Sequence, residues 1–341
     1  MWSRQEPVAL FSGCIFNQFQ GESVSQGKII VLGTGGTIAG KALSPADHRG
    51  YRAAQIGVEQ LLQGVVGLEQ WAQGPVVAEQ VAQVDSKDMD WSVWQALALR
   101  CAHHLANPQV RALVITHGTD TLEETAWFLH CVLPPTKPIV LTCAMRPATA
   151  LVPDGPQNLC DAVALAATPK VQGVMVVAAG CIHSAVAVQK VHPYRLDAFD
   201  SGDYGPLGWI EECAVRWAQN RPLSLTGKAQ AAIKNIASAR YLPRVDVVMS
   251  HAGADGRIVD ALVADGVQGL VVAATGNGTL HYALHAALER AQRAGVVVWV
   301  AARCPLGRIR TSSQDPFRDA QGLSPVKARI ALQLQLLKDF S

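Results

Sequence analysis

Hydroxyl and carboxylate side chains gather in three short loops, each of which follows an apolar run. The loops span residues 33–41, 85–89 and 116–124. The first presents Thr37 among glycines, and the third places Thr119 directly beside Asp120. A threonine hydroxyl is a weak nucleophile that needs an adjacent base. The third loop therefore offers a nucleophile and a base, and the first offers a hydroxyl at the end of a predicted strand.

Two phosphate-binding patterns nearly fit the first loop. The dinucleotide fingerprint G-x-G-x-x-G fits until its last position, which is Ile38. The P-loop pattern fits from Gly35 to Lys41, but Ala42 stands where a hydroxyl must bind Mg²⁺. The remaining interpretation is that glycines such as Gly36 let the backbone approach a small ligand closely.

The other two loops also have structural interpretations. Ser86 or Asp88 can cap the helix that follows, although a helix N-terminus also attracts an anion such as a substrate carboxylate. Thr121 and Glu124 fit a capping box. His117 can be a general base, but packing beneath the loop is the favoured interpretation of this histidine.

Short apolar runs alternate with segments of helical apolar spacing along the chain. The predicted strands are 28–32, 76–81, 111–116, 138–142, 173–178, 245–249, 269–273 and 296–301. The predicted helices are 91–105, 121–132, 158–167, 259–263, 279–293 and 325–337. Continuous apolar strands separated by helices predict a parallel sheet covered on both faces. Ligands of such sheets bind beyond the carboxyl ends of the strands, where the three loops lie.

The predicted fold is α/β, with a larger N-terminal domain built on a mainly parallel sheet and a smaller C-terminal α/β domain. Residues 1–27 are an N-terminal arm, and residues 28–210 form the larger domain with the reactive loops. The alternation breaks over residues 211–243, which we interpret as an interdomain linker. Residues 244–341 form the second domain.

The composition narrows the classes of partner. Charged residues make up 16% of the chain and hydrophobic residues 49%, so much of the chain is buried in cores or subunit contacts. The net charge is +2, and the basic residues form no stripe with interleaved aromatics, so no nucleic-acid partner is expected. No apolar run reaches the roughly 20 residues of a membrane span. No metal is expected, because no ligand cluster is present.

The eight cysteines form no C-x-x-C pair and have no zinc-site spacing. Several lie in apolar runs, where a reduced cysteine behaves as a small hydrophobe. We therefore predict a reducing, cytoplasmic location. Export with lipoprotein anchoring is a minor alternative: residues 11–14 resemble a lipoprotein cleavage box, but the apolar run before Cys14 is short and no basic start precedes it.

Several motifs together resemble the bacterial-type L-asparaginase and glutaminase-asparaginase family. The two principal signatures are Gly33-Thr34-Gly35-Gly36-Thr37-Ile38-Ala39 and His117-Gly118-Thr119-Asp120-Thr121. Further matching stretches are residues 56–61 after Tyr51, 144–147, 154–159, 204–208 and 276–278. The resemblance runs from about Lys28 to the C-terminus.

The resemblance implies a role for each matching residue in the hydrolysis of L-asparagine to L-aspartate and ammonia. Thr37 resembles the nucleophile that forms an acyl-enzyme, and Tyr51 resembles the residue of a mobile lid over it. Thr119, Asp120 and Lys190 resemble a proton-handling triad. The implied substrate contacts are Ser86 for the α-carboxylate, Asp120 for the α-ammonium, and backbone N–H groups of the glycine-rich loop, with Gly36, and of Gly118-Thr119 for the oxyanion.

The resemblance also implies a homodimer or homotetramer, with sites formed between subunits and no cofactor. Three positions depart from the family pattern: Lys87 replaces a glutamine, Thr279 an asparagine, and Phe317 lies near a glutamate that one subunit lends to its neighbour. If Lys87 contacts the α-carboxylate, asparagine is favoured and glutamine is the poorer substrate. Two other functions stay open on the same scaffold: the asparaginase-like subunit of a tRNA-dependent amidotransferase, and a non-catalytic amino-acid sensor. A nucleotide-binding P-loop protein is a more distant alternative.

Overall fold

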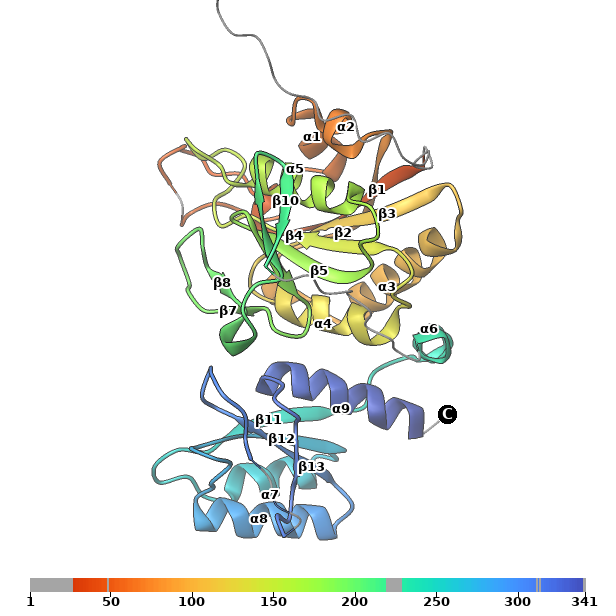
Figure 1. Ribbon diagram of the computed structural model, residues 1–341. Helices are drawn as coiled ribbons and strands as arrows, with labels where there is room; N and C mark the ends of the chain where they lie inside the picture. The colour runs from red at the N-terminus through yellow and green to blue at the C-terminus, as the bar shows by residue number, and fades with distance from the viewer. Residues whose placement is uncertain (1–26, 48, 219–228, 311, 313, 340–341) are drawn as a thin grey trace, which may run out of the picture.

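The computed structural model describes residues 27–47, 49–218, 229–310, 312 and 314–339. Two α/β parts follow each other along the chain, as Figure 1 shows, each built around its own sheet. The helix α9 (Pro325–Asp339) lies between them. The predicted fold class is therefore confirmed.

The larger part is built on an eight-stranded sheet. Its strands, in order across the sheet, are β10 (Ala214–Trp217), β9 (Gly208–Glu211), β6 (Cys181–Ser184), β5 (Gly173–Ala178), β4 (Pro138–Thr142), β3 (Val110–Thr116), β1 (Lys28–Gly35) and β2 (Val76–Val84). The five strands from β5 to β2 are parallel, and β6, β9 and β10 are antiparallel. Because β1 pairs with both β2 and β3, the loops after these three strands leave the sheet at one edge.

Helices cover both faces of this sheet. They are α1 (Val58–Gln63), α2 (Leu68–Ala72), α3 (Trp91–Ala106), α4 (Leu122–Val132), α5 (Gly155–Ala167) and α6 (Ala229–Ser238). Along β1, Ile30 and Leu32 pack into the core under α3 and α4, whereas Ile29 and Val31 face the core under α2 and α5. This alternation explains the continuous apolar run, since successive side chains of a strand point to opposite faces.

The smaller part has a four-stranded parallel sheet in the order β11-β12-β13-β14. Its elements are β11 (Val245–Met249), α7 (Arg257–Ala264), β12 (Gly269–Ala274), α8 (Tyr282–Arg293), β13 (Val297–Ala302) and β14 (Arg318–Asp319). Helices α7 and α8 cover one face. On the other face α9 contributes Leu332 and Leu336 to the smaller part's core, while its Ile330 and Leu334 pack into the core of the larger part.

The structure corrects several local expectations. Within residues 211–243, strand β10 pairs with β9 and extends the large sheet, so this segment is more than a linker. Asp90, rather than Ser86 or Asp88, caps α3 by accepting from the Val93 N–H. The Thr121 side chain makes no cap at α4, so the predicted capping box does not form. The predicted arm lies, apart from Gly27, outside the described residues.

Candidate active site

The loops after β1 and β3 touch through their glycines. A Cβ added to Gly36 would lie 2.2 Å from the Gly118 Cα, and one added to Gly118 would lie 2.4 Å from the Ser86 Oγ. Gly36 also has a φ of 80°, which strains any other residue. Its N–H donates to the Val84 carbonyl at 2.9 Å and is therefore already occupied. The two glycines bring the three loops together, and the backbone of Gly118 and Thr119 supplies the remaining oxyanion candidates.

Thr37 begins a short 3₁₀ turn, Thr37–Ala39, directly after β1. Its hydroxyl lies 2.7 Å from the Tyr51 hydroxyl, and its side chain is buried. Burial raises the pKa of Tyr51, the hydrogen bond with Thr37 lowers it, and the nearby carboxylates of Asp85 and Asp120 raise it further. The balance is upward, so Tyr51 is a neutral phenol at neutral pH.

The segment that carries Tyr51 is folded over Thr37. The two ends of this segment are joined by two backbone hydrogen bonds between Lys41 and Arg52, of 2.9 and 2.8 Å. The Leu151 N–H donates to the Pro45 carbonyl at 3.1 Å, which ties the segment to the loop after β4. The segment therefore holds the Tyr51 hydroxyl against Thr37.

Lys190 lies on the short strand β7 (Gln189–Lys190), which pairs with β8 (Phe199–Asp200). Its Nζ donates to the Thr119 Oγ1 at 2.8 Å and to the Asp120 Oδ1 at 2.6 Å. The Thr119 hydroxyl also faces the Asp120 carboxylate at 3.4 Å. Residues separated by about 70 positions thus meet as a hydroxyl, an amine and a carboxylate, the arrangement that the resemblance implies.

Ser86 joins the second and third loops. Its Oγ accepts from the Asp120 N–H at 3.1 Å, and its carbonyl accepts from the Thr121 hydroxyl at 2.8 Å. Ser86 is buried, whereas about half of the Asp120 side chain is exposed. The Ser86 hydroxyl is therefore fixed to the backbone of Asp120, whose carboxylate pairs with Lys190.

Lys87 lies among carboxylates of its own loop, and its expected contact with the substrate's α-carboxylate stays a prediction. Its ammonium pairs with Asp88 and lies 3.3 Å from Asp85, and 60% of its side chain is exposed. These carboxylates raise the pKa of Lys87, Asp88 being the stronger influence. Lys87 thus offsets part of the negative charge of Asp85 and Asp88 in the second loop.

His117 packs beneath the third loop, as the favoured interpretation holds. It is fully buried, with Nδ1 2.7 Å from the Gly118 carbonyl and Nε2 2.9 Å from the Thr125 hydroxyl. Burial lowers the pKa of His117 to about 4, so the ring is neutral at neutral pH. Both nitrogens are engaged, and His117 supports the loop rather than acting as a base.

The two C-terminal departures lie around one pocket of the smaller part, beside the Asn277-Gly278 turn. Phe317 is buried in the core of that part, with its ring 5.2 Å from the His285 ring. Phe317 is therefore a core residue of the smaller part. Thr279 bonds back to the Thr275 carbonyl at 3.0 Å.

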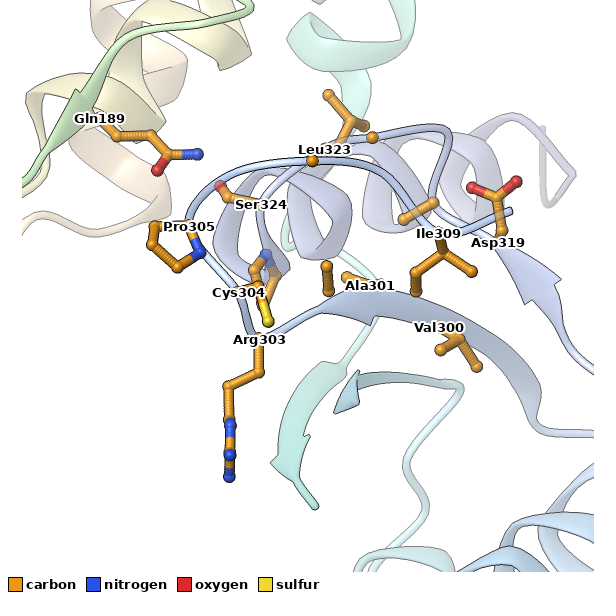
Figure 2. A pocket seen from close by; sticks show the side chains of 15 residues that line it. Gln189, Val300, Ala301, Arg303, Cys304, Pro305, Ile309, Asp319, Leu323 and Ser324 are labelled. Carbon is orange, nitrogen blue, oxygen red and sulfur yellow. The ribbon is translucent and has the colours of Figure 1, made fainter. Parts of the chain in front are cut away.

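A separate pocket opens beside β7. Figure 2 shows Gln189, the neighbour of Lys190, facing Cys304, Pro305 and Ser324 of the smaller part across this pocket. Among the described residues, no group of three or more His, Cys, Asp or Glu side chains could hold a metal ion. No helix in the same ranges is long and apolar enough to cross a membrane.

Sequence reasoning missed Glu123. Its carboxylate accepts from the Lys190 N–H at 3.2 Å, and burial raises the pKa of Glu123. In the sequence this residue reads only as an acidic side chain in the first turn of α4, where it suits the helix dipole. No local signal reports a contact with a residue 67 positions away.

Both parts of the chain match known protein families. The Asparaginase, N-terminal family model matches residues 28–223, and the Glutaminase/Asparaginase C-terminal domain model matches residues 244–341. A probable periplasmic L-asparaginase of Haemophilus influenzae is 36% identical, over 90% of this chain and 88% of that protein. A glutaminase-asparaginase of Pseudomonas fluorescens is 36% identical, over 91% of this chain and 86% of that protein.

Solved structures give the same result. The crystal structure of a probable cytoplasmic L-asparaginase from Campylobacter jejuni superposes with a TM-score of 0.84 at 36% identity. The superposition covers 92% of this chain and 95% of that one. With both domain models matched in order and relatives aligned over most of its length, the chain belongs to the asparaginase family.

Proposed function

We propose that this amidohydrolase converts L-asparagine to L-aspartate and ammonia through an acyl-enzyme on Thr37. The observation that carries the proposal is the Thr37 hydroxyl at the carboxyl end of β1, 2.7 Å from a phenol that keeps its proton. The Thr37 proton can pass to this phenol as the hydroxyl attacks, provided that the phenol gives up its own proton at the same time.

The proposed role of Tyr51 follows from where each proton must go. A neutral phenol is a poor base, so Tyr51 acts as a relay that accepts the Thr37 proton while passing its own to the leaving nitrogen. The Thr37 oxygen forms the ester, the carbon–nitrogen bond breaks, and ammonia leaves with that proton. Water then cleaves the ester, and Lys190, bonded to Thr119 and Asp120, is the second proton carrier.

Substrate orientation follows from the groups beside the nucleophile. The Ser86 hydroxyl binds the α-carboxylate, and the half-exposed Asp120 carboxylate binds the α-ammonium. The Gly118 and Thr119 N–H groups are the proposed donors to the developing oxyanion. With the α-carboxylate and the α-ammonium both bound, only a side chain of one length places its amide at Thr37.

This fixed length predicts the choice between the two amides. Glutamine has one more methylene, which displaces its amide from Thr37 when its α-groups are bound. One methylene commonly changes kcat/KM by about 10- to 200-fold. We propose that asparagine is favoured within this range, and equal kcat/KM for the two amides would refute the length argument.

We further propose a homodimer or homotetramer, a cytoplasmic location and catalysis without a cofactor. The low charged fraction of 16% supports extensive apolar subunit contacts. The buried free thiols of Cys101 and Cys143 suit a reducing compartment. Light scattering of the purified chain tests the assembly.

Ammonia release by Thr37→Ala tests the reaction. Deleting a nucleophile costs on the order of 10⁴-fold in kcat. Thr34→Ala is the matched control, because Thr34 lies in the same loop and donates to the Thr116 carbonyl instead. Thr34→Ala should keep a kcat close to wild type, and a Thr37→Ala variant that keeps a tenth of the activity rules Thr37 out.

The same assay separates the two rival functions. A subunit of an amidotransferase releases ammonia only with its partner chain, and a sensor binds the amino acid without turnover. Turnover of asparagine by the purified chain alone excludes both. Binding of asparagine without ammonia release supports the sensor instead.

A further inference from the structure

A buried lysine from the smaller part reaches into the larger one. Lys327, in the first turns of α9, has no exposed surface. Its Nζ donates to the carbonyls of Ala185 at 3.0 Å, Val186 at 2.9 Å and Val188. A lysine ammonium has three N–H donors, and all three are satisfied by one short segment of backbone.

That segment is the turn that leads to Lys190. The N–H groups of Ala187 and Val188 both bond to the Ser184 carbonyl, at 3.2 and 3.0 Å, which folds residues 184–188 tightly. Three carbonyls of the turn are thereby directed at Lys327. Strand β7 begins at Gln189, so Lys190 lies two residues after Val188, whose carbonyl accepts from Lys327.

Glu123 interacts with both Lys190 and Lys327. Its carboxylate accepts from the Lys190 N–H, and its charge is attracted to Lys327. Burial lowers the pKa of Lys327 to about 8, an effect that Glu123 opposes, so the ammonium form prevails at neutral pH. Lys190 therefore projects its Nζ toward Thr119 from a backbone that Glu123 and the pairing of β7 with β8 hold in place, directly after the turn bound by Lys327.

Loss of the Lys327 ammonium is expected to destabilise the turn of residues 184–188. Without the Lys327 ammonium, the carbonyls of Ala185, Val186 and Val188 lose this donor, and leaving a buried carbonyl unsatisfied is unfavourable. The turn is then expected to shift until water or other donors reach it. Because α9 packs on the cores of both parts, the shift is resisted at the helix and taken up by the turn.

We propose that Lys327 is a positioning residue for Lys190, by which the smaller part sets the geometry of the reactive site in the larger one. The inference rests on the proposed function of Lys190 in proton transfer. A displacement of about 1 Å of a catalytic group costs on the order of 100-fold in rate. The expected effect of losing Lys327 is thus a 10- to 100-fold fall in kcat, with KM little changed because Ser86 and Asp120 bind the substrate.

A double-mutant cycle tests whether Lys327 acts through Lys190. Lys327→Met keeps the length of the side chain and removes the ammonium, and it is made in the wild type and in Lys190→Met. If Lys327 only positions Lys190, Lys327→Met lowers kcat in the wild type and has no further effect in Lys190→Met. An equal fold-loss in both backgrounds overturns the proposal.

Arg329→Met is the matched control on the same helix. The Arg329 Nε donates to the Val245 carbonyl within the smaller part at 3.1 Å. The control should lower the thermal midpoint as Lys327→Met does but leave kcat close to wild type. A similar fall in kcat in both variants means that α9 acts through stability alone and overturns the proposal.

Two further points keep the result decisive. Should Lys327→Met fail to fold, Lys327→Arg keeps the cation while its planar guanidinium cannot match all three carbonyls, and the same cycle applies. A Lys190→Met variant with wild-type kcat refutes the proposed role of Lys190 itself. That failure is recognised before Lys327 is considered.

Discussion

The hydrogen bond between Thr37 and Tyr51 predicts a defined loss in Tyr51→Phe. The substitution keeps the ring over the nucleophile and removes only the hydroxyl at 2.7 Å. Hydrogen bonds to groups that develop charge are worth about 1.5–3 kcal/mol, and each 1.36 kcal/mol is tenfold in rate. We therefore expect kcat to fall by about 10- to 150-fold, because Thr37 is buried and water does not easily replace the phenol.

The assay is continuous ammonia release over a range of asparagine concentrations. KM should change little, since Tyr51 touches the nucleophile and not the groups proposed to hold the substrate's ends. Tyr241→Phe is the matched control, because the Tyr241 side chain is exposed and lies at the connection before β11. A fall in kcat of less than about twofold in Tyr51→Phe, below the value of a single net hydrogen bond, refutes the relay.

Three further outcomes follow from the structure. The lid over residues 40–52 should resist protease when saturated with aspartate and be cut more readily without it; equal cleavage in both samples argues against a closing lid. Lys87→Gln should raise KM for asparagine about two- to fivefold, the value of an exposed ion pair, because its acidic neighbours are left to repel the substrate carboxylate; an unchanged KM contradicts this. The Glu79 carboxylate bonds Arg100 and lies 2.8 Å from His104, and mainly the Arg100 hydrogen bond lowers the pKa of Glu79 to about 2. Because the pKa of Glu79 is lower in the folded protein than in the unfolded chain, its ionised carboxylate stabilises the fold above about pH 4.5, and this stabilisation is lost as the pH falls toward 2. Glu79→Gln should therefore reduce the free energy of unfolding by on the order of 1–2 kcal/mol at neutral pH and make that free energy decline less steeply between about pH 4.5 and 2. Urea unfolding at several pH values measures this, and an acid decline equal to that of the wild type contradicts it.

Apolar periodicity predicted most of the fold. Strands β4, β5 and β11 have the predicted bounds, and the other buried strands differ by a few residues at their ends. Strands β4 and β5 are buried on both faces, so their sequence is set by the core, whereas β11 keeps a mainly apolar sequence although Val247 and Met249 are exposed. Strand β10 was missed because it is short, half-exposed and at the edge of the sheet, where packing does not impose an apolar run.

The reactive loops were predictable because glycines and hydroxyls recur at strand ends. Caps were not, since Asp90 competes with Ser86 and Asp88 within five residues, and only the backbone path shows that Ser86 bonds to Asp120 instead. Lys327 has no signal in the sequence. A lysine near the start of an apolar helix looks like a solvated side chain until the fold places the turn of residues 184–188 against it.

The central claim is that Thr37, and not Thr119, is the nucleophile, and one measurement tests this claim most directly. Rapid acid quench of the enzyme during asparagine turnover, followed by digestion and mass spectrometry, identifies the residue that carries the β-aspartyl ester. The account predicts the ester on the peptide that contains Thr37, and its absence in Thr37→Ala. An ester on the peptide that contains Thr119 would contradict the account, because it would make Thr37 a supporting hydroxyl and Lys190 the base of the nucleophile.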